Sequence, residues 1–416
     1  MRSYTKEEKS WMWYDWGHSA YSVIISTAVF PLFYKAAAEG AGVSAADSTA
    51  YLGYAISIST LVLALLGRIL GTIADYQGFK KTFFAGFSLL GIAATALLAF
   101  IPHNNWELLL VCYMFIAIGS AGSAVFYDAF LVDVTVDDRM NKVSARGFAI
   151  GYIGSTIPFL VSIAIILLAE QEILPLSVTS ASQIAFFITA LWWGVFTLPM
   201  LRNVRQKHYM KREPRILTNS FKSLFQTFKQ IKQHRAIFIF LLAYFFYIDG
   251  VGTIITMSTA YGTDLGIEST DLLIILFVTQ VVASPFAILY GRLADRFSGK
   301  TMLYVGICVY IVVCVYAYFM KSAFDFWVLA MLVATSQGGI QALSRAYFAR
   351  MVPKENANRF FGFYNIFDKF ASILGPFLVG VTAQLTGNTS IGVFSLVILF
   401  IIGIFILMRV PEPGSK

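Results

Sequence analysis

Roughly twelve apolar stretches, each about 20 residues long, divide this chain of 416 residues. A helix of that length crosses a bilayer whose hydrocarbon core is about 30 Å thick, so each stretch is a candidate membrane span. The stretches do not alternate apolar and polar residues and are about twice as long as a membrane strand, which excludes a closed barrel. The predicted spans are residues 13–35, 50–74, 82–101, 107–133, 147–169, 182–201, 237–261, 270–291, 301–320, 326–349, 360–385 and 390–409.

The charges of the chain agree with an all-α membrane protein. Apolar residues make up 58% of the sequence and charged residues 13%, against about 25% charged in soluble proteins. When both termini are placed in the cytoplasm, most of the 31 basic residues fall on that side and only Lys35 and Lys321 on the other. This topology accounts for the net charge of +8, so we expect no nucleic-acid partner. The expected location is the bacterial inner (plasma) membrane.

The longest connection between spans predicts the domain organisation. Residues 202–236 separate six spans from six and carry many basic residues but one acid, Glu213. Apolar residues recur there at helical spacing between positions 217 and 231, which is typical of an amphipathic helix on the inner leaflet. We therefore expect a basic cytoplasmic linker at 202–236, between an N-terminal six-helix bundle at 1–201 and a C-terminal one at 237–416.

Two loops, one in each half, repeat a pattern of Gly, then Asp four residues later, then Gly and Lys. They are residues 71–81 and 291–300. The pattern resembles the cytoplasmic loop between the second and third helices of each half of a major facilitator protein. The resemblance implies the major facilitator fold: twelve transmembrane helices in two six-helix, pseudo-symmetric bundles that carry a solute by alternating access.

Longer strings in both halves resemble one branch of that superfamily, the bacterial "unknown major facilitator" family, which is similar to the fungal vacuolar amino-acid effluxers linked to autophagy. The strings are Tyr14-Asp15-Trp16, Ser19-Ala20-Tyr21, Phe126-Tyr127-Asp128-Ala129-Phe130-Leu131, Val143-Ser144-Ala145-Arg146-Gly147-Phe148, Gly151-Tyr152-Ile153-Gly154, Asp249-Gly250-Val251, Gly338-Gly339-Ile340-Gln341-Ala342-Leu343-Ser344-Arg345, Phe361-Gly362-Phe363-Tyr364 and Gly375-Pro376. The resemblance implies a transporter and leaves its solute open.

Ionisable residues inside the predicted spans indicate an inner gate. A charge at the bilayer centre costs about 2.5–3.5 kcal/mol on insertion scales, so such residues are expected to face protein or water. All but one of these ionisable residues fall in the cytoplasmic third of their spans. There, residues of opposite charge on different helices could pair, for example Asp128 with Arg345. The alternative is that their side chains extend to the membrane interface without pairing. The predicted gate and conformational residues are Asp75, Lys80, Lys81, Asp295, Arg296, Lys300, Arg68, Asp133, Asp368 and Lys369.

The exception is Asp249, about twelve residues into its span and beside Gly250 and Gly252. Transporters built from repeats place their sites near the midplane, so Asp249 is the first candidate for a substrate-amine or proton site. A neutral, hydrogen-bonded Asp inside the bundle is the equally weighted alternative.

Polar residues form stripes at helical spacing on four predicted spans, which the resemblance makes cavity-lining helices. Alternatively, the Ser and Thr side chains of these stripes only form hydrogen bonds within the helical bundle and line no cavity. His18 is a candidate for proton coupling or a structural hydrogen bond. Tyr244 and Tyr247 lie near the stripes, whereas Trp192, Trp193 and Trp327 are expected at the membrane interfaces. The stripes comprise Asp15, Ser19, Ser22 and Ser26; Ser120, Ser123, Tyr127 and Asp128; Asp249, Thr253 and Thr256; and Gln337, Gln341 and Arg345.

The predicted substrate or proton site draws on these stripes and on neighbouring aromatic residues. Its members are Asp249, Asp15, His18, Tyr21, Tyr127, Asp128, Thr253, Gln337, Gln341 and Arg345.

These residues favour a secondary or facilitative transporter of a small polar or zwitterionic, amino-acid-like solute, with protons as a further partner. A lipid or lysophospholipid transporter of the same fold is the alternative. An intramembrane aspartyl protease is disfavoured, because the required Gly-x-Gly-Asp order is absent. The sequence lacks Walker, dinucleotide and zinc patterns, so we expect no cofactor, no metal and no enzyme activity. We expect membrane lipids around a monomer.

Overall fold

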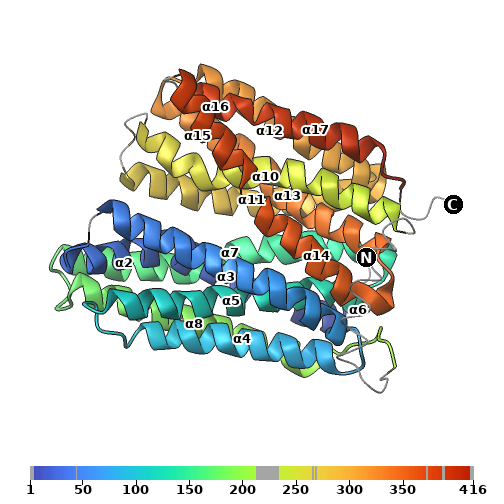
Figure 1. The fold of residues 1–416 in the computed structure, drawn as a ribbon, viewed down its shortest axis with the longest axis horizontal. Coiled ribbons are helices and arrows are strands. Elements are labelled where there is room, and N and C mark those ends of the chain that lie inside the picture. Colours follow the sequence, from blue (N-terminus) through green and yellow to red (C-terminus); the bar gives the residue numbers. More distant parts are fainter. Residues whose placement is uncertain are drawn as a thin grey trace. The chain divides into compact units, whose positions relative to one another are not determined.

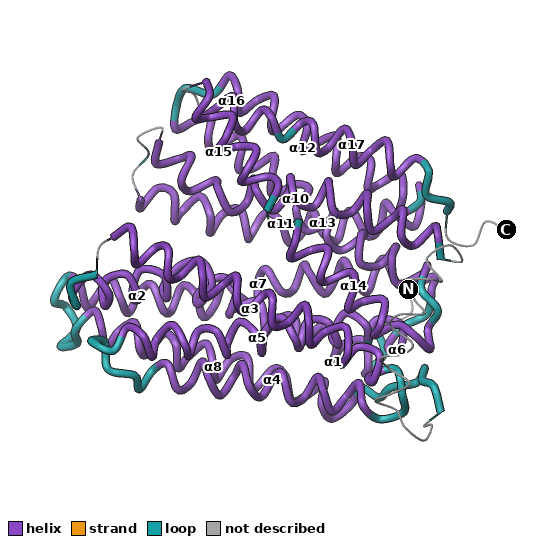
Figure 2. Tube along the Cα trace, in the orientation of Figure 1, coloured by secondary structure: helices purple, strands orange, loops and turns teal. Residues whose placement is uncertain are grey.

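A computed structural model describes residues 4–43, 45–211, 234–264, 267, 269–371, 373–386 and 389–412 (Figure 1). Helices make up nearly all of this part of the chain, as Figure 2 shows. The predicted amphipathic helix between residues 217 and 231 lies outside the described residues.

The contacts between helices divide the chain into two compact units. Unit 1 comprises Met1–Val134 and Ile150–Phe221, and unit 2 comprises Thr135–Ala149 and Lys222–Lys416. One helix is therefore shared, because its first turns pack in unit 2 and the remainder packs in unit 1. The boundaries 1–201, 202–236 and 237–416 stay a prediction.

Unit 1 is a helical bundle in which α4 packs against α5 and α8, and α1 packs against α8. A capping box starts α1, in which the Thr5 hydroxyl accepts from the Glu8 N–H and the Glu8 carboxylate accepts from the Thr5 N–H. The helices of unit 1 are α1 (Lys6–Ala20), η1 (Tyr21–Ala28), α2 (Val29–Gly40), α3 (Ala45–Ala74), α4 (Phe79–Leu98), α5 (Trp106–Ala129), α6 (Leu131–Val134), the shared α7 (Met140–Glu170) and α8 (Val178–Asn203). The short η2 (Asp137–Arg139), between α6 and α7, belongs to unit 2.

Unit 2 is a second bundle, in which α13 packs against α11 and α12, and α10 packs against α17. A capping box between Ser322 and Asp325 starts α13. Its helices are α10 (Arg235–Asp264), α11 (Ser269–Phe297), α12 (Gly299–Phe319), α13 (Ala323–Met351), η3 (Lys354–Asn356), α14 (Ala357–Phe370), α15 (Leu374–Thr386), α16 (Thr389–Ser395) and α17 (Val397–Met408).

All twelve predicted spans coincide with helices. Among the described residues, ten helical segments are long and apolar enough to cross a membrane. The other two predictions, 50–74 and 360–385, correspond to the 30-residue helix α3 and to the successive helices α14 and α15. The expected all-α membrane fold is confirmed, but the span predicted at 360–385 is broken between Phe370 and Leu374.

The first predicted span also differs from a regular α-helix. The continuous helical segment Lys6–Gly40 changes to a π-helix over the eight residues Tyr21–Ala28. The Thr27 hydroxyl donates to the carbonyl of Ser22, five residues earlier, at 2.8 Å. A π-helical turn is often found at functional sites, and here it exposes the hydroxyl groups of Ser22, Ser26 and Thr27.

Candidate functional site

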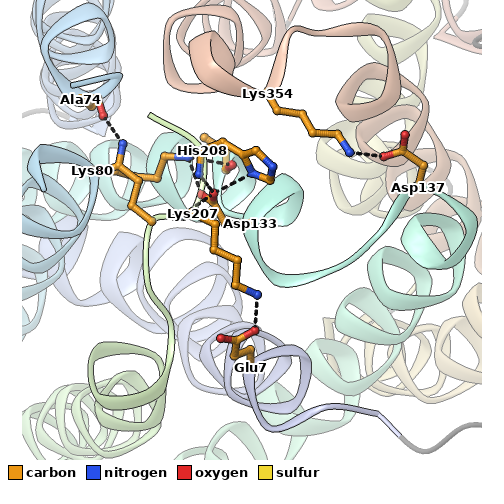
Figure 3. Close-up of polar contacts among 10 residues, drawn as sticks. Glu7, Ala74, Lys80, Asp133, Asp137, Lys207, His208 and Lys354 are labelled. Carbon is orange, nitrogen blue, oxygen red and sulfur yellow. Dashed lines mark hydrogen bonds and ion pairs between the residues drawn. The ribbon is translucent and has the colours of Figure 1, made fainter. Parts of the chain in front are cut away.

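A buried ion pair at one end of unit 1 joins the short helix α6 to the start of α4 (Figure 3). The Lys80 ammonium is 2.7 Å from Oδ2 of Asp133, and both side chains are 0% exposed. The other oxygen, Oδ1, accepts the backbone N–H groups of Lys207 and His208 at 2.9 and 2.8 Å. The ring Nδ1 of His208 lies 3.1 Å from the same oxygen. Asp133 thus joins α4 to the segment that follows α8.

That segment, residues 204–210, which we name the strap, is bound along the loop between α3 and α4. The Met210 N–H donates to the Asp75 carbonyl at 2.8 Å, and the Gln77 N–H donates to the Met210 carbonyl at 3.1 Å. The Gln206 amide accepts from the Gly78 N–H and donates to the Ala74 carbonyl, each at 3.0 Å. Gly78 has a φ of 87°, a conformation that glycine adopts without strain. The predicted gate residue Asp75 is therefore buried in a loop that the strap covers.

The remaining predicted gate residues of unit 1 are Lys81 and Arg68. The Lys81 ammonium donates to the Val204 carbonyl at 3.0 Å, so it binds the start of the strap. The side chain of Arg68 lies outside the described residues.

A polar and aromatic cluster joins α1 to α5 inside unit 1. The Tyr14 hydroxyl donates to the Ser123 hydroxyl at 2.8 Å, and Nε2 of His18 lies 2.8 Å from the Ser120 hydroxyl. Asp15, which is partly buried, accepts the Ser19 hydroxyl at 3.3 Å. The α5 stripe thus contacts Tyr14 and His18, which flank the predicted α1 stripe. The α1 stripe lies beside α7, because a Cβ added on Gly151 would lie 2.7 Å from Oγ of Ser19.

Packing explains several aromatic candidates in this cluster. Tyr127 stacks on Trp11 with ring centroids 4.5 Å apart, and its carbonyl accepts the Trp11 indole N–H at 2.9 Å. Trp193 is 0% exposed and contacts the rings of His18 and Tyr21. The prediction that Trp193 lies at a membrane interface is wrong, because α8 turns this side chain into the bundle. Asp128 is partly buried on α5.

In unit 2, Asp249 lies at the break between α14 and α15. Its Oδ2 accepts the N–H of Gly375, in the first turn of α15, at 2.9 Å. The Tyr244 hydroxyl, earlier on α10, donates to Asp368 in the last turn of α14 at 2.8 Å. The side chain of Lys369 lies outside the described residues.

Arg345 on α13 is buried against the first turns of α7, within unit 2. Its Nε donates to the Ser144 hydroxyl at 3.0 Å and its Nη2 to the Ser144 carbonyl at 3.2 Å. The guanidinium lies over the ring of Phe148, 4.4 Å from its centroid. Arg345 therefore holds residues 144–148 of α7 onto α13.

The second repeated loop is anchored differently from the first. Asp295 lies 2.8 Å from the Lys142 ammonium of α7, and the Lys300 ammonium donates to the Val410 carbonyl at 2.6 Å. Arg296 is exposed and lies over the ring of Phe297. An added Cβ on Gly291 would lie 2.5 Å from Cβ of Ala145, so α7 and α11 approach closely here.

A narrow pocket of about 50 Å³ lies between α10, α11 and α13 in the described part of unit 2. Its lining is mainly aliphatic and aromatic, and Gln337 and Gln280 supply amide groups. Gln341, one turn along α13 from Gln337, is partly buried. Among the described residues, no three His, Cys, Asp or Glu side chains are grouped so that they could hold a metal ion.

The comparison with known families decides the class of this chain. The model of the family described as "Vacuole effluxer Atg22 like" matches residues 4–416. The chain belongs to this family. A relative from Bacillus subtilis (strain 168), described as the uncharacterized MFS-type transporter YxiO, is 69% identical over 415 residues, which cover 100% of this chain and 97% of the relative. Autophagy-related protein 22 of Saccharomyces cerevisiae (strain ATCC 204508 / S288c) is 25% identical over 420 residues, covering 87% of this chain and 78% of that protein.

Solved structures show the same fold at low sequence identity. The transporter FucP in its outward conformation has a TM-score of 0.73 at 13% identity, covering 99% of this chain and 100% of that chain. The proton:xylose symporter XylE has a TM-score of 0.67 at 11% identity, covering 98% and 94%. The chain is thus a multi-pass transporter of the major facilitator superfamily (MFS), and its relatives and structural neighbours are transporters, not enzymes.

Two parts of the site do not follow from the sequence patterns, and a third has a sequence signal. The strap contacts through Lys207 and His208 join residues far apart in sequence. No sequence pattern identifies Ser144 as the residue that accepts hydrogen bonds from Arg345. For the helix break, Gly375-Pro376 is a usable signal, because proline lacks an N–H and restricts the residue before it.

Proposed function

We propose that this member of the family is a secondary transporter of a small zwitterionic, amino-acid-like solute. The observation that carries the proposal is Asp249, which is 1% exposed within the candidate span Arg235–Ser258. An ionisable group inside the bilayer is costly, and in membrane proteins it commonly marks a solute or ion pathway. The resemblance to fungal vacuolar amino-acid effluxers supports the same class of solute.

A zwitterion needs groups of both signs, and unit 2 carries both on membrane-spanning helices. Asp249 on α10 suits an ammonium group or a proton, and Arg345 on α13 suits a carboxylate. Gln337 borders the pocket between α10, α11 and α13 and can donate and accept hydrogen bonds. We assign the following residues to solute or proton binding: Asp249, Asp15, His18, Tyr21, Tyr127, Asp128, Thr253, Gln337, Gln341 and Arg345.

For alternating access, we propose that the first turns of α7 form an inner gate. These turns contact α13 through Arg345 and α11 through Asp295, while α7 from Ile150 onward packs in unit 1. A change of access must therefore strain or release those contacts. The repeated loops and their charged residues belong to the same proposed gate, with both termini in the cytoplasm of a bacterial cell and the transporter acting as a monomer.

Transport by purified protein in proteoliposomes tests this function. Uptake and counterflow are measured for a panel of amino acids, short peptides and lysophospholipids, with and without a proton gradient. We expect counterflow of at least one amino acid and its loss in Asp249→Ala. Asp271→Asn, which removes an exposed acid from the first turn of α11, is the matched control and should transport normally. Movement of lysophospholipids alone would instead establish the lipid-transporter alternative.

A further inference from the structure

The pocket between α10, α11 and α13 holds two glutamine side chains in a mainly apolar part of unit 2. Gln337 is 4% exposed, and its side-chain amide has no hydrogen bond to another described residue. Gln280 has a buried amide oxygen that also lacks a partner among the described residues. A polar group inside a bilayer is costly unless it is paired, because no bulk water reaches it. Two unpaired amides beside one pocket therefore indicate a ligand that forms hydrogen bonds.

The two hydroxyl groups of the pocket can only accept further hydrogen bonds. The Ser258 hydroxyl donates to the Ile255 carbonyl at 2.8 Å, and the Thr279 hydroxyl donates to the Ile275 carbonyl at 2.7 Å. Each hydroxyl has a single hydrogen, so only its oxygen lone pairs are left for a ligand. Together with the amide oxygens, these hydroxyls give the lining more acceptor positions than donor positions. The pocket therefore favours a ligand group that carries N–H.

The lining also selects for a neutral group. None of the residues that line the pocket is charged, and apart from the four polar ones they are aliphatic or, at Phe326, aromatic. Asp249 and Arg345 are not among them. A carboxylate or an ammonium group would lose its water here without meeting an opposite charge, which is costly.

The volume of the pocket limits this neutral group to a few atoms. One water molecule needs about 10–15 Å³ of such volume, so about 50 Å³ holds roughly four water-sized groups. A primary carboxamide with its adjoining methylene group matches this size. A short aliphatic group also matches it, but would leave both glutamine amides unpaired.

A carboxamide complements both glutamines. It carries two N–H donors and an acceptor oxygen, as each glutamine amide does. A half-turn of a terminal amide exchanges its oxygen and its NH₂ group, so Gln280 and Gln337 can each donate or accept as the ligand requires. A site built to form hydrogen bonds discriminates strongly against an analogue that lacks them, because its own polar groups then stay unpaired.

We infer that this pocket is a carboxamide subsite, which selects amino acids whose side chain ends in a primary amide, glutamine or asparagine. Gln280 and Gln337 bind the amide, and the aliphatic lining contacts the methylene groups. The pocket lies on α10 and α13, the helices that also carry Asp249 and Arg345, so the amino and carboxylate groups of the solute can bind outside it. This inference rests on the proposed function, because it names the class of solute that the transporter takes.

Binding of three matched solutes to the full-length purified protein tests the subsite without any variant. Glutamine, methionine and glutamate have side chains of similar length, which end in an amide, a thioether and a carboxylate. Thermal unfolding is followed as each solute is added, because a ligand of the folded state raises the midpoint according to its Kd. We expect glutamine to bind about tenfold or more tightly than methionine, since a net hydrogen bond is worth about that factor, and glutamate not to bind.

A variant then assigns the preference to the pocket. Gln280→Leu removes one amide and keeps the pocket apolar, so its affinity for glutamine should fall about tenfold and its affinity for methionine should not fall. Without solute it should unfold at the same or a higher temperature, because an unpaired amide has left the apolar interior. The control is Gln171→Leu, which replaces an exposed glutamine between α7 and α8 and should bind all three solutes as wild type does.

Equal affinities for glutamine and methionine, or full glutamine affinity in Gln280→Leu, would overturn the subsite and leave a pocket for ordered water only. The subsite and the proposed function fail separately. Counterflow of amino acids without a preference for glutamine rejects the subsite alone. Glutamine binding that Gln280→Leu weakens, without counterflow of any amino acid, supports the subsite and rejects the transport function alone.

Discussion

The Lys80 ammonium contacts Oδ2 of Asp133 at 2.7 Å, and water reaches neither side chain. The remaining oxygen of Asp133 is occupied by two backbone N–H groups of the strap and by the His208 ring. A buried carboxylate with this many donors is fully compensated, so the pair is a structural anchor of unit 1. Lys80 belongs to the first repeated loop, residues 71–81, and Asp133 binds the strap. The pair therefore ties the repeated loop to the strap.

Removing one member of this buried pair should strongly destabilise the protein. Asp133→Ala or Lys80→Ala leaves an uncompensated buried charge, which costs about 3–5 kcal/mol of the free energy of unfolding. The control is Lys354→Ala, because the Lys354–Asp137 pair is 35% and 53% exposed and worth about 0–1 kcal/mol. Chemical unfolding in mixed micelles measures both. Equal losses for the buried and the exposed pair would contradict the anchor.

Asp133 should also hold the strap, which hydrogen exchange can follow. In Asp133→Ala the Lys207 and His208 N–H groups lose their acceptor, so exchange in residues 204–210 should rise about tenfold or more, equivalent to at least about 1.4 kcal/mol. His208→Ala removes the ring contact but keeps both backbone bonds, and should change exchange much less. If the His208 variant frees the strap as fully as the Asp133 variant, the ring and not the backbone is the anchor.

Local pattern was enough to predict the helices and the family of folds. The length of each apolar run fixes whether it can cross a bilayer, and the repeated Gly-to-Asp spacing at 71–81 and 291–300 identifies the loops. Counting positions along one run also placed Asp249 deep inside a span. Each of these features depends only on residues that are close together in the sequence, so it can be recognised without a structure.

The partners of individual side chains were not predictable in the same way. That Ser144 would accept from Arg345, or that the strap would reach Asp133, depends on which helices become neighbours in space. The break after Phe370 has a local signal in Gly375-Pro376, but many spans tolerate proline, as α7 does at Pro158. Trp193 was misplaced because aromatic residues occur both at membrane interfaces and in the cores of bundles.

The close approach of α7 and α11 should tolerate no side chain at Gly291. In Gly291→Val the new atoms clash with Ala145, where α7 starts and α11 ends, and such overpacking costs about 1–3 kcal/mol. Gly380→Ala in α15 is the control, because no atom lies within 4 Å of its added Cβ and alanine favours helix. Thermal unfolding of the purified variants separates them. A wild-type midpoint for Gly291→Val would show that α7 and α11 are not tightly packed.

The contact between Lys142 and Asp295 should affect transport more than stability. The two side chains are 51% and 22% exposed, so their pairing contributes about 0–1 kcal/mol to the free energy of unfolding. If the first turns of α7 are the inner gate, a bias of about 1 kcal/mol between open and closed states still changes their ratio about fivefold. Lys142→Asp or Asp295→Lys alone should therefore alter counterflow of an accepted amino acid several-fold, and the double reversal should restore it.

The control is Glu7→Lys, which disrupts the similarly exposed Glu7–Lys207 pair of unit 1, outside the proposed gate. Rescue should weaken in about 1 M salt, because the Debye length then falls to about 3 Å, close to the separation of the two exposed charges. Single reversals that leave counterflow unchanged, or a double reversal that does not restore it, would remove this pair from the gate.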